Sequence, residues 1–226
     1  MNILIVAAHP DDEVLGAGGT IARHARDGEE VAIVILGEGQ TSRYPTRKAA
    51  DPSLVSVLAE QAKESARRLG AKECICCGLP DNRFDTLPLL DIVKLVEEWV
   101  QRLQPQVVYS HHPGDLNVDH GITARAVLTA TRPAPGCPVR ELYAFEVPSS
   151  SEWSFQRLAP PFAPNAFVDI AETLQTKLTA MEAYESEVRP FPHPRPPEAL
   201  EAIARRWGSV AGVTAAEAFE LVRAIR

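Results

Sequence analysis

The sequence has few sulfur-containing residues, with four cysteines and two methionines in 226 residues. Three of the cysteines, Cys74, Cys76 and Cys77, stand in the strand-like segment ECICCG, and the fourth is Cys137. Strand geometry makes pairing within this segment awkward and favours burial as small apolar side chains. A zinc role for Cys76 and Cys77 is the alternative, but no CxxC pair supports it. We therefore expect reduced cysteines in a cytoplasmic protein.

Long apolar runs and clustered positive charge are also missing. No apolar run approaches the length that spans a bilayer, so no membrane insertion is expected. Met1 leads directly into a strand-like run, without the positively charged start or cleavage site of a signal peptide. The net charge of −7 comes from residues of both signs spread along the chain. Because no basic stripe is available for a nucleic-acid backbone, nucleic acid is not expected as a partner.

Apolar runs alternate with helical periods through the first part of the chain. Four expected strands are each followed by an expected helix: Ile3–Ala8 and Gly18–Arg26, Val31–Leu36 and Leu54–Leu69, Glu73–Cys77 and Leu89–Leu103, and Val107–Tyr109 and Ile122–Thr131. This alternation, with strands that are apolar throughout, is typical of a parallel sheet buried on both faces. The expected fold class is therefore α/β, a Rossmann-like, mostly parallel sheet with helices on both faces.

The pattern changes after Pro133. We expect one domain over residues 1–226, divided into a core over 1–132 and a small cap region over 133–226. The cap is expected to hold strands at Leu142–Val147 and Phe167–Ile170, a proline-rich loop around Pro160–Pro164, and helices at Glu172–Glu187, Glu198–Trp207 and Thr214–Ile225. The segment RPFPHPRPP, from Arg189 to Pro197, cannot form a regular helix.

A histidine and three acidic residues follow the first expected strand, in the run HPDDE. Imidazole and carboxylate groups hold zinc in hydrolytic sites, and a further carboxylate can act as a general base. Pro10 fixes the direction of the chain at this point. The alternative is a solvated turn in which Asp11 or Asp12 caps a helix.

A second polar cluster, SHHPGDLNVDH, follows the strand-like run Val107–Tyr109. Ligands bind at the carboxyl ends of strands in open α/β sheets, so two such clusters can converge on one site. His120 is the candidate third metal ligand. Asp119, beside it, is an alternative cap for the following helix.

Three glycines, Gly16, Gly18 and Gly19, follow the first polar cluster. A dinucleotide-binding GxGxxG motif would need a glycine at position 21, where the chain has Ile21. Close packing of a helix on a strand is the favoured explanation, and a nucleotide cofactor is not expected.

The run AHPDDE and the later DH pair, each behind a strand, resemble the LmbE/PIG-L family of zinc-dependent de-N-acetylases. The resemblance covers most of the chain. It includes FEVPSSSEW at Phe145–Trp153, AYESE at Ala183–Glu187 and HPRP at His193–Pro196, which look like one bacterial branch. It implies a hydrolase that releases acetate from an N-acetylated amino sugar or its conjugate.

The family pattern implies that His9, Asp12 and His120 bind Zn²⁺ and that Asp11 is the general base. Three protein ligands leave a position open for the water that attacks the acetamide. Glu13 is expected to orient the turn or cap the helix rather than bind the metal.

One position departs from the pattern of the family. Many members carry a histidine three positions before the last ligand, where it helps to stabilise the oxyanion, and this chain has Asn117 there. An asparagine cannot carry positive charge. His193, on its proline-framed loop, is the first candidate for the missing cationic donor, with a surface turn as the alternative; His111 and His112 come next.

Groups around the site are expected to support the ligands and the substrate. Asp115 is expected to hold the His120 loop or orient a ligand imidazole, and Asp119 to lie behind the metal ligands. His112 is expected to contact the substrate or to stand beside a ligand. Arg43 and Arg195 are candidates for contact with a sugar hydroxyl, phosphate or carboxylate, or else are solvated loop charges. Two arginines would favour an anionic acceptor.

Two other functions stay open. One is a catalytically impaired protein that binds a sugar or nucleotide sugar, suggested by Asn117, and the other is a metal-dependent amidohydrolase acting on a non-sugar amide. A homo-oligomer is a further possibility, because relatives are often oligomeric.

Overall fold

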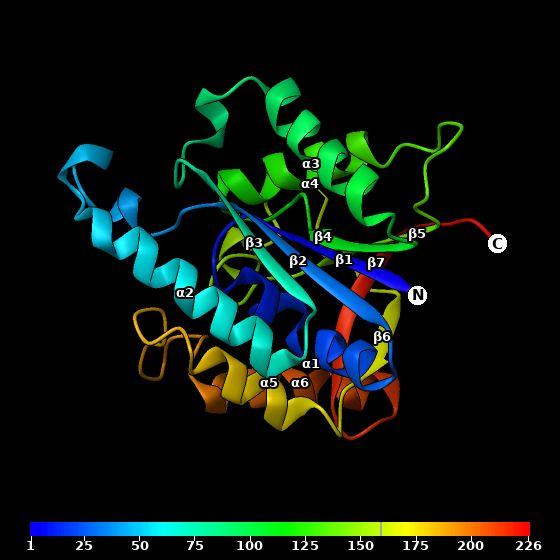
Figure 1. Cartoon of the computed structure of the whole chain (residues 1–226). Helices are drawn as coiled ribbons and strands as arrows, with labels where there is room; N and C mark the ends of the chain where they lie inside the picture. The colour runs from blue at the N-terminus through cyan, green and yellow to red at the C-terminus, as the bar shows by residue number, and fades with distance from the viewer. Residues whose placement is uncertain (159) are drawn as a thin grey trace.

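The structure is a computed structural model that describes residues 1–158 and 160–226. Within these ranges, seven strands form one sheet in the order β3-β2-β1-β4-β5-β7-β6 (Figure 1). The strands are β1 (Asn2–Ala7), β2 (Glu30–Gly37), β3 (Glu73–Leu79), β4 (Val107–His111), β5 (Glu141–Phe145), β6 (Ala166–Asp169) and β7 (Ala216–Ala224). The helices are α1 (Asp12–Arg26), α2 (Pro52–Leu69), α3 (Leu89–Leu103), α4 (Val118–Ala130), α5 (Leu174–Met181) and α6 (Pro197–Ala211).

Helices cover both faces of the sheet, as the continuous apolar strands predict. In Figure 1, α3 and α4 lie on one face, and α1, α2, α5 and α6 lie on the other. Alternate residues of β1 point into the two cores, with Ile3 and Ile5 in the core beneath α1 and Leu4 and Val6 in the core beneath α3. The expected α/β fold class is confirmed.

The first five strands in chain order are parallel neighbours, and β1 lies at the centre of them. β1 pairs with β2 on one side and with β4 on the other. The chain therefore moves outward from β1 in one direction first and then returns to continue in the other. This reversal places the carboxyl ends of β1 and β4 side by side, which is where an open α/β sheet forms its binding crevice.

Residues 133–226 extend this sheet. β5 pairs in parallel with β4, whereas β7 pairs antiparallel with both β5 and β6. The expected strands at Leu142–Val147 and Phe167–Ile170 are present as β5 and β6, and both belong to the main sheet. The expected helix at Thr214–Ile225 is wrong, because its residues lie in β7, where pairing with two neighbouring strands overrides the helix preference of an alanine- and glutamate-rich segment. The expected helix at Glu198–Trp207 is confirmed within α6.

Helix α1 begins at Asp12, six residues earlier than expected. Its glycines allow close packing, as the sequence predicts: a Cβ on Gly16 would lie 2.3 Å from Phe145 Cδ2, and one on Gly19 would lie 2.8 Å from Ile170 Cδ1. The helix is kinked at Ala17, which has φ −142°. Glu217 of β7 accepts from the backbone N–H of Gly19 at 2.9 Å and of the next residue at 2.7 Å. β7 thus helps to hold the helix whose first turn carries the acidic residues of the HPDDE run.

The four cysteines are free and half-buried. No helix in the described ranges has both the length and the apolar character needed to cross a bilayer.

Candidate active site

The HPDDE turn is held at the carboxyl end of β1 by hydrogen bonds within the turn itself. Asp12 Oδ2 accepts from the His9 backbone N–H at 2.8 Å, and the Asp11 carbonyl accepts from the N–H of Leu15 at 2.9 Å, starting α1. Asp11 has φ 100°, a backbone conformation that side chains other than glycine rarely adopt. The turn therefore aims its side chains in defined directions.

His120 enters the site from the first turn of α4. The Asn117 side chain caps this helix by accepting from the backbone N–H of Asp119 at 2.9 Å. The alternative in which Asp119 is the cap is therefore wrong. Because β4 lies beside β1, α4 starts next to the HPDDE turn and brings His120 to His9, 111 positions away in the sequence.

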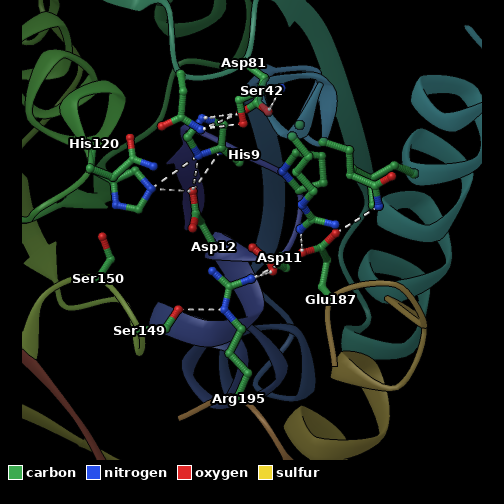
Figure 2. A pocket seen from close by; sticks show the side chains of 17 residues that line it. His9, Asp11, Asp12, Ser42, Asp81, His120, Ser149, Ser150, Glu187 and Arg195 are labelled. Carbon is green, nitrogen blue, oxygen red and sulfur yellow. Dashed lines mark hydrogen bonds and ion pairs between the residues drawn. The ribbon is translucent and has the colours of Figure 1, made fainter. Parts of the chain in front are cut away.

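Three donor atoms converge at the centre of the site (Figure 2). His9 Nδ1 lies 3.4 Å from Asp12 Oδ2, His120 Nε2 lies 3.2 Å from the same oxygen, and the two nitrogens are 3.3 Å apart. Ligand bonds of about 2.0–2.1 Å at tetrahedral angles around zinc separate the ligand atoms by about 3.3 Å. All three side chains are buried. The expected triad is thus brought together with the spacing that a tetrahedral cation requires, and these residues could hold a metal ion.

Buried carboxylates contact the outer nitrogens of both histidines. Asp119 Oδ2 lies 2.9 Å from His9 Nε2, and its other oxygen accepts from the backbone N–H of Phe84 at 2.9 Å. Asp115 Oδ2 lies 3.1 Å from His120 Nδ1. Such contacts fix the tautomer and the orientation of a ligating imidazole. Asp115 therefore contacts His120, as the sequence predicts, and Asp119 contacts His9.

The buried carboxylates around His9 and His120 favour positive charge at the triad. Burial alone lowers the pKa of both histidines, but the carboxylates around them outweigh burial and raise the pKa of His9 to about 10 and of His120 to about 9. For Asp12, burial opposes the same attraction, and the two histidines hold its pKa well below the usual range. A bound metal ion would supply the positive charge that protons on the histidines otherwise provide.

Asp11 points away from the triad toward Arg195 (Figure 2). Arg195 Nη1 lies 2.6 Å from Asp11 Oδ2, and Arg195 Nε donates to Ser149 Oγ at 2.8 Å. Burial raises the pKa of Asp11 to about 8, and the guanidinium opposes this rise. The proline-framed loop therefore delivers a cation to Asp11, and that cation is Arg195.

Glu13 braces the turn from behind. One oxygen accepts from the Asp11 backbone N–H at 3.1 Å and the other accepts from the Tyr184 hydroxyl at 2.5 Å. Burial raises the pKa of Glu13 to about 8. Glu13 thus lies where the expected orienting role requires.

Glu187, which the sequence reasoning missed as a site residue, connects three segments. It is buried, and its oxygens contact Gln40 Nε2 at 2.9 Å, Arg43 Nη2 at 2.5 Å and Arg195 Nη1 at 3.4 Å. These attractions outweigh burial and lower its pKa. The sequence placed Glu187 at the end of a helix, whereas α5 ends at Met181. Two signals were available: the AYESE run, which ends at Glu187, and the position of this acidic residue just before a proline-rich loop.

A polar cavity of about 160 Å³ joins these groups. It brings together seven expected site residues: His9, Asp11, Asp12, Arg43, Asn117, His120 and Arg195. It also includes polar residues that the sequence reasoning missed: Gln40, Ser42, Asp81, Asn82, Ser149, Ser150 and Glu187. Seven non-glycine residues of the described ranges have positive φ, and Asp11, Gln40, Asn82 and Ser149 among them line this cavity. Backbone strain of this kind gathers at functional sites.

The structure does not bring His193, His111 or His112 into this cavity. The ring of His193 packs edge-on against Trp153, with ring centres 5.5 Å apart, and its Nδ1 accepts from the Arg195 backbone N–H at 3.3 Å. His111 stacks on His120 with ring centres 4.0 Å apart, and burial lowers its pKa to about 3. His112 lines a different cavity.

Comparison with known proteins agrees with this geometry. Residues 4–131 match the family model described as PIG-L, GlcNAc-PI de-N-acetylase. A probable N-acetyl-alpha-D-glucosaminyl L-malate deacetylase 2 from Bacillus anthracis is 26% identical, covering 82% of this chain and 81% of the relative. A 4-oxalmesaconate hydratase from Pseudomonas putida is 31% identical, covering 80% and 72%. The crystal structure of the conserved protein TT1542 from Thermus thermophilus is 28% identical with a TM-score of 0.76, covering 99% and 96%. The chain belongs to the PIG-L family of GlcNAc-PI de-N-acetylases.

Proposed function

We propose that the chain is a zinc-dependent N-deacetylase that releases acetate from an N-acetylated amino sugar or a conjugate of one. The observation that carries the proposal is the convergence of a three-ligand set and a neighbouring carboxylate, Asp11, in one polar cavity. Family membership and the deacetylase relatives support the reaction class.

The three ligands and Asp11 divide the work. His9, Asp12 and His120 would hold the metal, which would polarise the acetamide carbonyl and make water a better nucleophile. Asp11 is the general base: it takes a proton from the attacking water and passes it to the leaving amine. The Arg195 guanidinium, 2.6 Å away, favours the ionised form of Asp11, as this role requires.

Arg195 also supplies the cationic donor that the chain lacks at position 117. Asn117 uses its side-chain oxygen to cap α4, whereas Arg195 carries a permanent charge and fixed N–H donors at the cavity wall. We propose that Arg195, rather than His193, steadies the negative charge that develops on the acetamide oxygen.

The walls of the cavity support a hydroxyl-rich substrate. Serine, asparagine and glutamine side chains line it together with carboxylates, a mixture that can donate to and accept from sugar hydroxyls. Arg43 and Arg195 are already paired with Glu187 and Asp11, so an anionic group on the substrate would have to compete for them. The expected anionic acceptor therefore stays a prediction.

An acetate-release screen with zinc-loaded protein tests the proposal. Nucleotide-linked N-acetylglucosamine, N-acetylglucosamine phosphate and neutral N,N′-diacetylchitobiose cover the anionic and neutral alternatives. Asp11→Asn is expected to lower kcat about 10²- to 10⁴-fold with the zinc content unchanged, because a general base is removed while the ligands remain. Asp91→Asn, at an exposed position of α3, is the matched control. Full acetate release by Asp11→Asn, or none by the zinc-loaded wild type on any substrate, contradicts the proposal.

Water addition to an unsaturated carboxylate is the second candidate. The observations in its favour are the hydratase relative, 31% identical, and the two guanidinium groups of the cavity. It would use the same metal ligands without breaking an amide bond. The test is to incubate the protein with a conjugated dicarboxylate and follow the ultraviolet absorbance of that compound. A protein that removes this absorbance but releases no acetate in the screen favours this candidate.

A further inference from the structure

A buried ion pair from α5 and β7 contacts α1 at its kink. Lys177 of α5 and Glu217 of β7 are 5% and 4% exposed, and Lys177 Nζ lies 2.6 Å from Glu217 Oε1. Charged residues are rarely buried to this extent, because the cost of removing both charges from water offsets much of their attraction. None of the catalytic roles proposed above uses this pair.

The pair contacts both ends of one step in the hydrogen-bond ladder of α1. In a regular α-helix the N–H of residue 19 donates to the carbonyl of residue 15. In this structure the Leu15 carbonyl accepts from Lys177 Nζ at 2.8 Å, and the Gly19 N–H donates to Glu217 Oε1 at 2.9 Å. Side chains inserted into the ladder are a known cause of helix kinks, and the non-helical residue, Ala17, lies midway between these two positions. The ion pair therefore links the two halves of α1 across the kink.

The half of α1 before the kink carries acidic residues of the candidate active site. Asp12 begins the helix, and the N–H of Leu15 donates to the Asp11 carbonyl at 2.9 Å. Leu15 is thus bound to the HPDDE turn through its N–H and to Lys177 through its carbonyl. The direction of this half, and with it the place of the Asp12 carboxylate in the triad, depends on the kink that the pair maintains.

We propose that Lys177 and Glu217 are positioning residues for the metal site, which hold α1 in the kinked form that places Asp12 against the two histidines. The proposal rests on the proposed function, because it takes the triad to bind zinc. The backbone of α1 could close the same step of the ladder by itself, so the helix does not need two buried charges in order to form. A purely structural pair contributes to stability alone, whereas removal of a positioning pair weakens metal binding in protein that is still folded.

Replacement of both charges tests this role. Lys177→Met combined with Glu217→Leu keeps two side chains of similar size and leaves no buried charge unpaired, so the protein is expected to fold. Without the pair, the Gly19 N–H is free to donate to the Leu15 carbonyl, and α1 is expected to straighten. The Kd for zinc, measured by competition with a chelator, is expected to rise about 10- to 100-fold. The visible spectrum of the cobalt-substituted protein, which reports the geometry of the ligands, is expected to change.

Two controls separate positioning from stability. Val96→Ala opens a cavity in the core beneath α3, on the other face of the sheet, and lowers stability at a distance from α1. Lys63→Met combined with Glu60→Leu makes the same kind of replacement in an exposed ion pair of α2. Both are expected to bind zinc as the wild type does. Wild-type zinc affinity and an unchanged cobalt spectrum in the Lys177 and Glu217 double variant overturn the proposal, and so does equal weakening in Val96→Ala.

A measurement on the wild type covers the case in which the double variant does not fold. Coupling between two sites is reciprocal, so zinc that depends on the pair also stabilises it. Zinc is expected to slow hydrogen exchange at the amides of Gly19 and Thr20, which donate to Glu217, more than at the amides of α3. Equal slowing overturns the positioning role.

Failure of the deacetylase reaction is recognised separately, because zinc affinity and hydrogen exchange are measured without substrate. Zinc binding that depends on the pair, in protein that releases no acetate, supports the positioning role without the reaction. A wild type that binds no zinc overturns the proposed function and the positioning role together.

Discussion

Arg195 and His193 lie two residues apart on one proline-framed loop. Only Arg195 lines the cavity that contains His9, Asp12 and His120. Its guanidinium is mostly buried and contacts Asp11, Ser149 and Glu187. The sequence alone leaves both residues as candidates for the cationic donor. The direction of each side chain depends on how residues 189–197 fold against the rest of the chain, which the sequence does not reveal. The candidate metal triad is easier to predict, since His9 and Asp12 follow β1 and His120 lies in the polar cluster that follows β4, the neighbouring strand.

Replacement of Arg195 tests which loop residue serves the reaction. Arg195→Ala is expected to lower kcat about 10- to 10³-fold, because a charged donor at the cavity wall is lost and Asp11 loses its counter-ion. His193→Ala is expected to stay within about threefold of the wild type, since its ring packs against Trp153 outside the cavity. Acetate-release kinetics at matched zinc content provide the measurement, and the reverse order of effects would support His193 as the missing donor.

Glu187 is expected to act as a positioning residue. Glu187→Gln keeps the shape of the side chain but removes the charge that holds Arg43 and Arg195. We expect kcat/KM to fall about tenfold with zinc content unchanged, through poorer placement of both guanidinium groups. Glu185→Gln, at an exposed position two residues earlier, is the matched control. Equal kinetics for the two variants would contradict the positioning role of Glu187.

At the scale of helices and strands, periodicity and apolar runs predicted the parallel part of the sheet and failed at β7. The segment AAEAFELVRAI has residues typical of helices, and its strand form depends on pairing with β5 and β6, which are distant in the sequence. Helix α1 begins at Asp12, before the expected start at Gly18, whereas the close packing expected of its glycines is present against Phe145 and Ile170.

Gly16 provides a test of this packing. Gly16→Ala is expected to lower the free energy of unfolding by about 1–3 kcal/mol, because the new methyl group would overlap the Phe145 ring. Gly121→Ala, in α4, is the control, since the nearest atom to its Cβ is 3.4 Å away and alanine favours a helix by up to about 1 kcal/mol. Urea denaturation of both variants measures the difference. A Gly16→Ala protein as stable as the wild type would contradict the packing argument.

For the molecule as a whole, the buried site links stability to pH and metal. The pKa of His9 is raised from 6.5 to about 10 and that of His120 to about 9, so the folded metal-free protein binds protons that the unfolded chain releases above pH 6.5. Burial also raises the pKa of Asp11 and of Glu13 to about 8. The folded protein therefore keeps these two protons at pH values at which the unfolded chain has already released them. The stability contributed by these groups is therefore lost as pH rises.

We expect the Tm of the metal-free protein to fall as pH is raised from 6.5 to 9.5. Over the same range zinc is expected to bind more tightly, because fewer protons have to leave the two histidines. Thermal unfolding with a chelator and with excess zinc, at matched ionic strength, measures both effects. A metal-free protein whose Tm rises across this range would contradict the charge balance described for the triad.

Strand β6 has a consequence for the order in which the chain becomes structured during synthesis. Its pairing partner in the sheet is β7, which emerges from the ribosome about fifty residues later and also packs against β5. The metal ligands are complete once His120 has been made, but the strand that carries Glu217, and with it the support for the kinked α1, is added afterwards. Strands β1 and β4, which bring the candidate ligands His9, Asp12 and His120 together, can therefore pair before β7 adds its support to α1.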